Sequence, residues 1–583
     1  MISRLYLLGL GSLLFTHLLA DGEEIGFEPV LEHIEEEMAV VPEALPRLPD
    51  DPIEHQDTVL HDQLNGIVLV GDRSDMLRNY DLDNFQGVET IDLMIPGGAA
   101  RLERELCVYL NQPLTRLTIR DIKYTISEYY RDNNYPLVVV EVPEQDITSG
   151  VLQLVILEGR LGKVSVQGNC YFSSQRLRNY IDLMPNDPIC ERGLIRDLNF
   201  INRNPFRRVD VVYSPGEDVG TTDLTLMVDD RRPLRFYAGV ENNGVPSTSR
   251  SRWLAGFNWG NAFWLDHILA YQFTASYKTS EFFAHTLQYI APLPWHHVFN
   301  VYGGYSRVSA DLPIPNMRNT GRSYQASGRY SIPLPPSRAL YHEFTIGYDW
   351  KRTNNTIEFS DTILNFGKNV NISQFLLGYS GNYERPRYRL DFGLDAVFSP
   401  GKMMSDQSKE DYESLREGAD NDWVYGVGQF VYLQRLPQDF SLSLLFKGQL
   451  TYQNLLPSEQ FYLGGYDTVR GYDQRQVNSD NGILLSGELR SPAVQILKHF
   501  KARHRNVRDA FQALIFLDYG WGINHDAIPG FPKSEWLMGA GPGVRYTIDP
   551  YLTARLDWGV KLHKQAAFGG GNTEVHFAVT ASY

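Results

Sequence analysis

The sequence predicts two α+β units followed by an all-β, 16-stranded antiparallel transmembrane barrel. A mixed pattern of helices and strands occurs twice between residues 85 and 230. From about residue 231 the helical period disappears, and about 16 short segments alternate apolar with polar side chains. Aromatic residues reach 12% although only 43% of residues are hydrophobic, as expected when many strands expose one apolar face.

The N-terminal residues 1–20 are predicted to be a secretory signal peptide. Arg4 precedes an apolar run over residues 5–19, and Ala20 is a plausible cleavage residue. No later stretch of about 20 apolar residues follows, so no transmembrane helix is expected. If the mature chain is embedded in a membrane, it must therefore be a closed barrel.

Residues 21–84 are predicted to be an N-terminal segment and linker. This stretch is acidic and rich in proline up to about residue 55, which disfavours regular structure. Residues 28–38 are the one candidate for a helix, and residues 67–70 are interpreted as a stray strand ahead of the first unit.

The two α+β units are expected at residues 85–159 and 160–230. In the first, Ile122, Ile126 and Tyr130 recur at helical spacing behind a helix start at Thr118. Its expected strands are residues 88–93, 137–142 and 151–157. The second unit should contain strands at 163–166, 209–213 and 224–228, and helical stretches at 173–183 and 193–202.

The barrel prediction for residues 231–583 depends on alternation and on loop length. Leu442, Leu444 and Phe446 fall on one face of a strand, and Ser443 and Lys447 fall on the other. A soluble β-sandwich would show the same alternation with its apolar face inward. Short proline-containing turns that alternate with long polar connections favour the membrane barrel. The long connections are expected at residues 309–322, 353–370, 399–422, 453–481 and 521–535.

Charge and cysteine content limit the partners and the compartment. The formal net charge is -16, so a nucleic-acid partner is not expected. Three cysteines cannot form a disulfide framework in so long a chain. Cys170 and Cys190 are close enough in sequence for one disulfide in an oxidising compartment, with two unpaired thiols as the alternative. Cys107 is left over in both cases.

Two motifs in the C-terminal half resemble those of a known family. The sequence FYLGG at 461–465 and the run Val469, Arg470, Gly471 and Tyr472 lie in the long connection between the eleventh and twelfth expected strands. The sequence FLDYG at 516–520 lies on the thirteenth. In these features the chain resembles the two-partner-secretion transporters of the ShlB/FhaC type, within the superfamily of polypeptide-transporting outer-membrane barrels.

The resemblance implies that the long connection folds back into the barrel lumen. Residues 28–38 are the one candidate for the N-terminal plug helix of the family. Alternation directs Phe516 and Asp518 to the lumen, so Arg470 and Asp518 are expected to form a charge-assisted pair. Gly471 permits the tight backbone that presents Arg470. The residues expected at this contact between loop and wall are Val469, Arg470, Gly471, Tyr472, Phe516, Asp518 and Gly520.

The resemblance also implies a function. The α+β units would be POTRA domains in the periplasm, and the barrel would lie in the bacterial outer membrane, in contact with its lipids. The domains would bind an extended, unfolded partner protein, an adhesin, cytolysin or toxin, for secretion through the barrel. Insertion of the barrel itself would depend on the barrel-assembly machinery. An assembly factor of the same superfamily is the alternative, ahead of a passive porin or adhesin.

Catalytic motifs are not found in the sequence. There is no phosphate-binding loop, and His342 and Glu343 lack the second histidine of a metalloprotease motif. The cluster Gly539, Gly541 and Gly543 is interpreted as close strand packing. No cofactor and no metal site are therefore expected, and the protein is not expected to be an enzyme.

Overall fold

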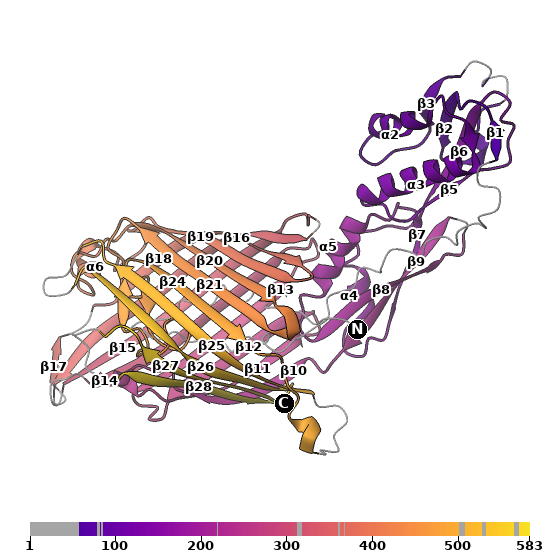
Figure 1. Cartoon of the computed structure of the whole chain (residues 1–583). Coiled ribbons are helices and arrows are strands. Elements are labelled where there is room, and N and C mark those ends of the chain that lie inside the picture. Colours follow the sequence, from indigo (N-terminus) through magenta and orange to yellow (C-terminus); the bar gives the residue numbers. More distant parts are fainter. Residues whose placement is uncertain are drawn as a thin grey trace. The chain divides into compact units, whose positions relative to one another are not determined.

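A computed structural model describes residues 58–583 except 79–81, 83–84, 219, 312–316, 338, 360–361, 366–367, 501–507, 527–531 and 565–570. The predicted signal peptide and the candidate helix at 28–38 lie outside the described residues. The described chain divides into two compact units, one formed by residues 58–203 and 207–231, the other by 204–206 and 232–583 (Figure 1). No described helix has the length and apolarity needed to cross a bilayer.

The first α+β unit contains a four-stranded sheet in the order β3-β2-β6-β5. Strand β2 is parallel to both of its neighbours and fully buried. Residues 67–70 therefore belong to the centre of this sheet, and the predicted boundary at residue 85 is too late. A strand covered on both faces does not alternate, which explains the misassignment. The strands are β2 (Gly66–Val70), β3 (Gly87–Ile91), β5 (Val138–Glu141) and β6 (Val151–Glu158).

Helices α2 (Ala99–Leu106) and α3 (Arg116–Asp132) pack their apolar faces on this sheet. Helix α3 begins earlier than predicted, because Thr115 is its N-cap and accepts a hydrogen bond from the Thr118 backbone N–H at 3.0 Å. Ile122 and Ile126 are fully buried, as their spacing predicts. The unit also contains the short pair β1 (Val59–His61) and β4 (Leu114–Thr115), with 3-10 turns η2 (Arg73–Asp75) and η3 (Cys107–Tyr109).

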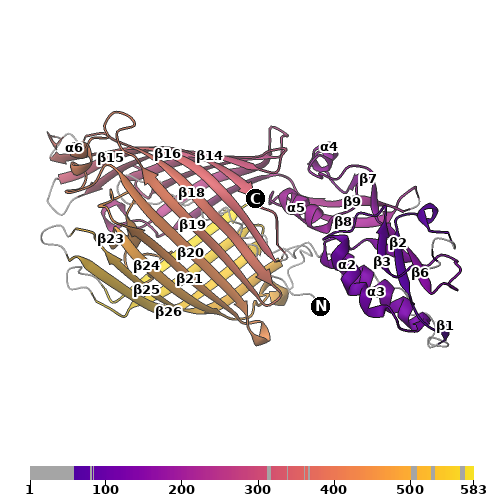
Figure 2. The ribbon, with the colours of Figure 1, turned by 90° about the horizontal axis from the view of Figure 1, so that it is seen from above.

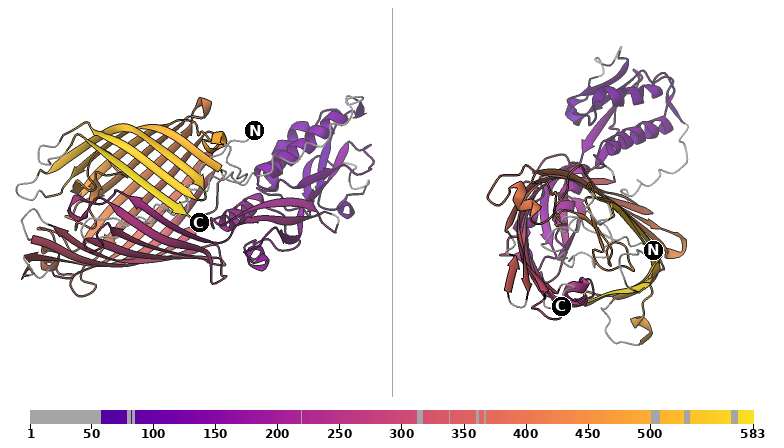
Figure 3. Two further views of the ribbon diagram at one scale, coloured as in Figure 1. Left: turned by 90° about the horizontal axis from the view of Figure 1, so that it is seen from below. Right: turned by 90° about the vertical axis from the view of Figure 1, so that its left-hand side faces the viewer.

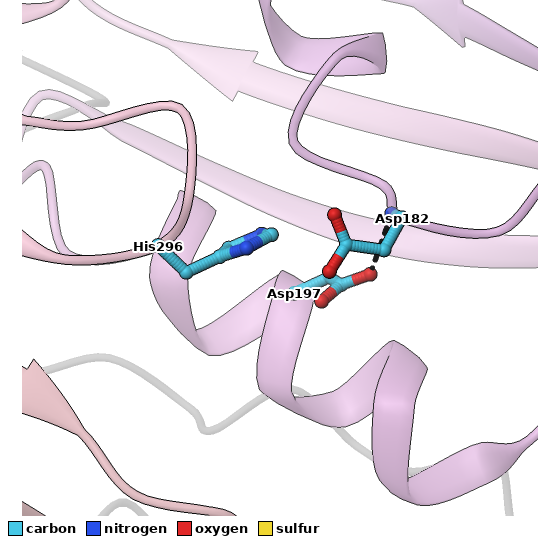
Figure 4. A group of neighbouring side chains, drawn as sticks. All are labelled: Asp182, Asp197 and His296. Carbon is cyan, nitrogen blue, oxygen red and sulfur yellow. Dashed lines mark hydrogen bonds between the residues drawn. The ribbon is translucent and has the colours of Figure 1, made fainter.

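The second α+β unit contains the sheet β7-β9-β8 with two helices. Helix α4 ends at Arg178 and is shorter than the predicted helical stretch. Four residues later the Asp182 backbone N–H donates to the buried Asp197 carboxylate of α5 at 2.9 Å (Figure 4). Its elements are β7 (Arg160–Gln167), α4 (Ser174–Arg178), α5 (Glu191–Ile201), β8 (Arg207–Pro215) and β9 (Thr221–Asp230).

Cys170 and Cys190 are both free thiols, as is Cys107, so the disulfide considered from sequence is absent. Pro188 pairs with Arg160 at the start of β7, whereas Cys170 follows the end of that strand. Eight extended residues span about 26 Å, whereas a disulfide needs Cα atoms within about 7 Å. The two thiols lie near opposite ends of one strand.

The second compact unit is a closed antiparallel barrel (Figures 2 and 3). Strand β10 pairs with β28 and so closes the ring. Strands β16 and β18 pair directly, and β17 (Thr362–Asn365) only extends their hairpin, so 16 strands form the wall. The predicted fold class is confirmed. The wall strands are β10 (Leu234–Glu241), β11 (Arg252–Ala262), β12 (His267–Ser276), β13 (Phe282–Pro292), β14 (Val298–Asp311), β15 (Met317–Pro333), β16 (Leu340–Phe359), β18 (Val370–Arg385), β19 (Tyr388–Ser399), β20 (Trp423–Arg435), β21 (Ser441–Thr451), β24 (Asn481–Arg490), β25 (Arg508–Ile523), β26 (Ser534–Asp549), β27 (Leu552–Lys561) and β28 (Thr573–Ser582).

The apolar rows of the wall face outward. Leu444, Leu517 and Trp558 are 44%, 50% and 52% exposed, whereas Asp518 and Asp557 are fully buried. The prediction of long loops is wrong in part for two of the five connections. Residues 309–311 and 317–322 lie in β14 and β15, and residues 353–359 and 362–365 lie in β16 and β17, so these strands continue as paired hairpins. Short helical segments between wall strands are η4 (Pro246–Thr248), α6 (Lys409–Glu413), η5 (Pro437–Asp439) and η6 (Leu497–Phe500).

Candidate functional site

The connection between β21 and β24, residues 452–480, packs inside the barrel and is called the lumenal loop below. Its two short strands, β22 (Phe461–Leu463) and β23 (Val477–Ser479), form a hairpin. Leu463 and Val469 on the loop form one buried apolar cluster with Leu484 and Leu537 on the wall. The loop therefore has a core of its own against the inner wall.

Glycines on the inner wall make room for this loop. A Cβ added at Gly539 of β26 would lie 1.9 Å from the Arg470 carbonyl oxygen, and one at Gly559 of β27 would lie 2.3 Å from the Gly471 nitrogen. At Gly520 of β25 the Cβ would lie 2.9 Å from Cγ2 of Val469. At Gly539 and Gly559 the loop backbone thus rests directly on wall backbone, at a distance that a larger residue would prevent, whereas at Gly520 the wall meets only loop side chains.

Arg470 at the tip of the loop is hydrogen-bonded to several wall residues. Its Nε and Nη2 donate to the two oxygens of Asp518 at 2.7 and 2.8 Å, and its backbone N–H donates to Asp518 at 3.0 Å. Nη1 donates to Glu488 of β24 at 2.5 Å. The guanidinium also lies 3.6 Å from the ring centre of Phe516, in cation–π contact. Both members of the pair are at least 96% buried as side chains.

The neighbours of Arg470 fix the loop backbone. Gly471 has φ +99°, a conformation that favours glycine, and its N–H donates to Nε2 of His576 on β28 at 3.1 Å. The Tyr472 hydroxyl donates to the Met538 carbonyl at 2.9 Å and accepts from the Met538 N–H at 3.2 Å. The tip is therefore attached to β24, β25, β26 and β28.

The charges around Arg470 form a network. Glu488 also accepts from Arg490 at 2.6 Å, and Asp557 accepts from Arg545 at 2.8 Å and from Arg555 at 3.0 Å. Carboxylates and guanidiniums alternate, so each buried charge has opposite charges beside it, as burial requires. The structure places all seven sequence-predicted contact residues at this site. It adds Glu488, Asp557 and His576, which alternation directs to the lumen but no motif singles out.

Two family models match the chain. The model for the haemolysin secretion/activation protein ShlB/FhaC/HecB matches residues 220–546, which is more than half of the sequence. The chain belongs to this family. A model of the ShlB-type POTRA domain matches residues 97–159 within the first α+β unit, and the sequence-based family prediction is confirmed.

Individual transporters are also similar to this chain. The heme/hemopexin transporter protein HuxB of Haemophilus influenzae strain 86-028NP is 22% identical over 75% of this chain and 76% of its own length. The outer membrane transporter CdiB of Dickeya dadantii is 23% identical over 67% and 69%. Among solved structures, CdiB from Escherichia coli has a TM-score of 0.75 at 18% identity, covering 92% of this chain and 93% of its own.

CdiB from Acinetobacter baumannii has the same fold, with a TM-score of 0.66 at 18% identity over 92% of this chain and 94% of its own. The family match and the 16-stranded barrel together define the activity. This chain is a two-partner-secretion transporter of the bacterial outer membrane, with a POTRA region in the periplasm.

Proposed function

We propose that this transporter moves an extended partner protein through the barrel lumen, and that the lumenal loop must leave the inner wall for the partner to pass. The observation that supports this is the loop's position. Leu463, Val469 and Arg470 are buried inside the barrel, against the wall that the partner would pass. A chain crossing the lumen would have to displace the contacts between Arg470 and Asp518.

We further propose that the partner first binds the free edge of β8 in the second α+β unit. In the described chain β8 pairs with β9 alone. The Asn202 side chain bonds both the N–H (2.7 Å) and the carbonyl (2.9 Å) of Val209. Alternate residues of an antiparallel strand direct these groups to the same edge, so Val211 and Tyr213 present theirs beyond the Asn202 contact. Addition of a strand there needs little sequence match.

We infer that the domain arrangement is a first POTRA domain from about residue 58 to 159 and a second from 160 to 231. The partner would be an adhesin, cytolysin or toxin, carried without chemical change. Outer-membrane lipids would cover the exposed apolar rows of the wall, and the barrel-assembly machinery would insert the chain. The family match with secretion proteins favours this function over that of an assembly factor.

A disulfide between loop and wall tests whether the loop moves. Cγ2 of Val469 lies 2.9 Å from the Cβ built at Gly520, which matches the separation of about 3 Å between a sulfur and the opposite Cβ in a disulfide. The variant Val469→Cys/Gly520→Cys, with Cys107, Cys170 and Cys190 replaced by serine, should secrete its partner only after reduction. Secretion is measured by immunoblotting of the culture medium.

Each single cysteine variant in the same background is the control, and both should be unaffected by reductant. Because the Gly520 Cβ meets only side-chain atoms of Leu463 and Val469, the single Gly520→Cys change is expected to be accommodated by small rotamer shifts. Full secretion by a quantitatively cross-linked double variant would show that the loop does not need to leave the wall.

A further inference from the structure

A second buried charge of the lumenal loop, Glu459, binds a different part of the wall. Its side chain is fully buried. Lys351 of β16 donates to Oε1 at 2.7 Å, whereas Gln374 of β18 and Tyr425 of β20 donate to Oε2 at 3.1 and 2.9 Å. Ser458, the neighbouring loop residue, donates to Oε1 at 3.0 Å. Donors from three wall strands thus converge on one loop carboxylate.

The two charged contacts lie on separate arcs of the barrel. Glu459 contacts β16, β18 and β20, and Arg470 contacts β24 and β25, with β21 between the two groups in the ring. The loop therefore connects one arc to the other. Gln449 of β21 donates to the carbonyls of Glu459 at 2.9 Å and of Asp480 at 3.1 Å, and so holds the two ends of the loop together.

The contact at Glu459 differs from a buried ion pair that only supports the wall. Arg329 of β15 and Asp349 of β16 are 4% and 5% exposed and lie 2.7 Å apart, but both belong to wall strands. In the Lys351–Glu459 pair one partner is on the loop and the other is on the wall. Loop movement breaks this pair and leaves both charges without their partners, which is costly in a buried site.

We propose that Glu459 is a second positioning residue for the lumenal loop. The barrel stays closed only when both the contact between Glu459 and Lys351 and the contact between Arg470 and Asp518 are formed. Release at Arg470 alone leaves the loop attached to β16, β18 and β20. Opening is then a two-step process, in which a partner has to displace loop contacts on both arcs. This inference rests on the proposed function only in taking the loop as the moving part.

Single-channel recording of the purified full-length protein in planar bilayers tests the proposal without any partner. Lys351→Met and Glu459→Gln each leave one buried charge unpaired, so the open probability should rise at least about tenfold over the parent. The double variant Lys351→Met/Glu459→Gln has no unpaired charge and should open more than the parent and less than either single variant. The charge-exchanged Lys351→Glu/Glu459→Lys variant should recover part of the closure.

Asp391→Asn is the matched control, because it removes a buried pair between Arg389 and Asp391, both on β19. It should leave the open probability unchanged. Heat-modifiable migration in gels shows which variants assemble, and the neutral double variant tests the contact where a single variant does not assemble. Open probabilities equal to that of Asp391→Asn would overturn the proposal. Conductance is read without secretion, so failure of the cross-linking test above would leave this result interpretable.

Discussion

The POTRA region and the barrel use the same strand alternation with opposite directions. In β9 of the second α+β unit, Leu224, Leu226 and Val228 are buried, whereas Met227 between them is 41% exposed. In β25 of the barrel, Ile515 and Leu517 are 60% and 50% exposed, whereas Asp518 is fully buried. The comparison teaches that an exposed apolar residue has a different meaning in each unit, because water surrounds one and hydrocarbon the other.

The largest expected effect comes from the same substitution at two equally exposed residues. Val212 in β8 and Leu517 in β25 are both 50% exposed. Leu517→Arg places a charge against lipid at a cost of about 2–4 kcal/mol near the midplane, so we expect little assembled barrel. Val212→Arg places its charge in water and should assemble normally. Heat-modifiable gel migration of membrane fractions measures both.

Leu517→Phe is the control for shape, since it keeps an apolar side chain on the lipid face, and it should assemble. If Leu517→Arg assembled normally and Val212→Arg did not assemble, the conclusion that lipid covers the outer face of the barrel would be contradicted.

A smaller effect is expected where the barrel wall contacts its own loop. Gly559→Ala brings a Cβ within 2.3 Å of the Gly471 nitrogen, and backbone cannot move aside as a side chain can. The barrel should assemble, but the loop should leave its position, with secretion altered severalfold and the open probability raised. Gly428→Ala is the matched control, because its Cβ would meet only side-chain carbons, at 3.4 and 3.8 Å. Equal behaviour of the two variants would contradict direct backbone packing of the loop.

Alternation and turn residues were sufficient to predict the barrel, because each wall strand contacts water on one side and lipid on the other. The strand number and the lumenal direction of Asp518 follow from this pattern. The same rule failed for β2, which is covered on both faces and so carries no alternation. It also failed where β14 to β16 extend beyond the apolar rows, because paired backbone needs no apolar side chains there.

At the site, the motifs led to Arg470 and Asp518 but not to their surroundings. Glu488 and Asp557 lie on other strands, and their contacts with Arg470 depend on barrel register, which a single sequence does not specify. Glu459 carries no motif, and its partner Lys351 is 108 residues away. The cluster Gly539, Gly541 and Gly543 predicts close strand packing, and the structure shows that Gly539 also admits the loop backbone.

The smallest effect concerns pH and is confined to the POTRA region. Burial raises the pKa of Glu158 although Arg160 lowers it, whereas the Thr148 N–H at 3.0 Å lowers the pKa of the exposed Asp146. Glu158 loses its proton more readily in the unfolded chain than in the folded protein. The contribution of Glu158 to the free energy of unfolding therefore falls as pH rises from about 4.3 through the folded pKa. For Asp146 the contribution is present at neutral pH and is lost as pH falls below about 4.

Substitutions of the two carboxyls should therefore shift stability in opposite directions. Relative to the parent, Glu158→Gln should be more stable at pH 7 than at pH 3, because it removes a partly buried carboxylate that ionises at a cost. Asp146→Asn should be less stable at pH 7 than at pH 3, because it removes a favoured carboxylate. Urea unfolding of a fragment of residues 58–231, followed by circular dichroism at both pH values, measures the two differences. Shifts of the same sign in both variants would contradict the burial of Glu158, and with it the water-excluding core that distinguishes this region from the water-lined interior of the barrel.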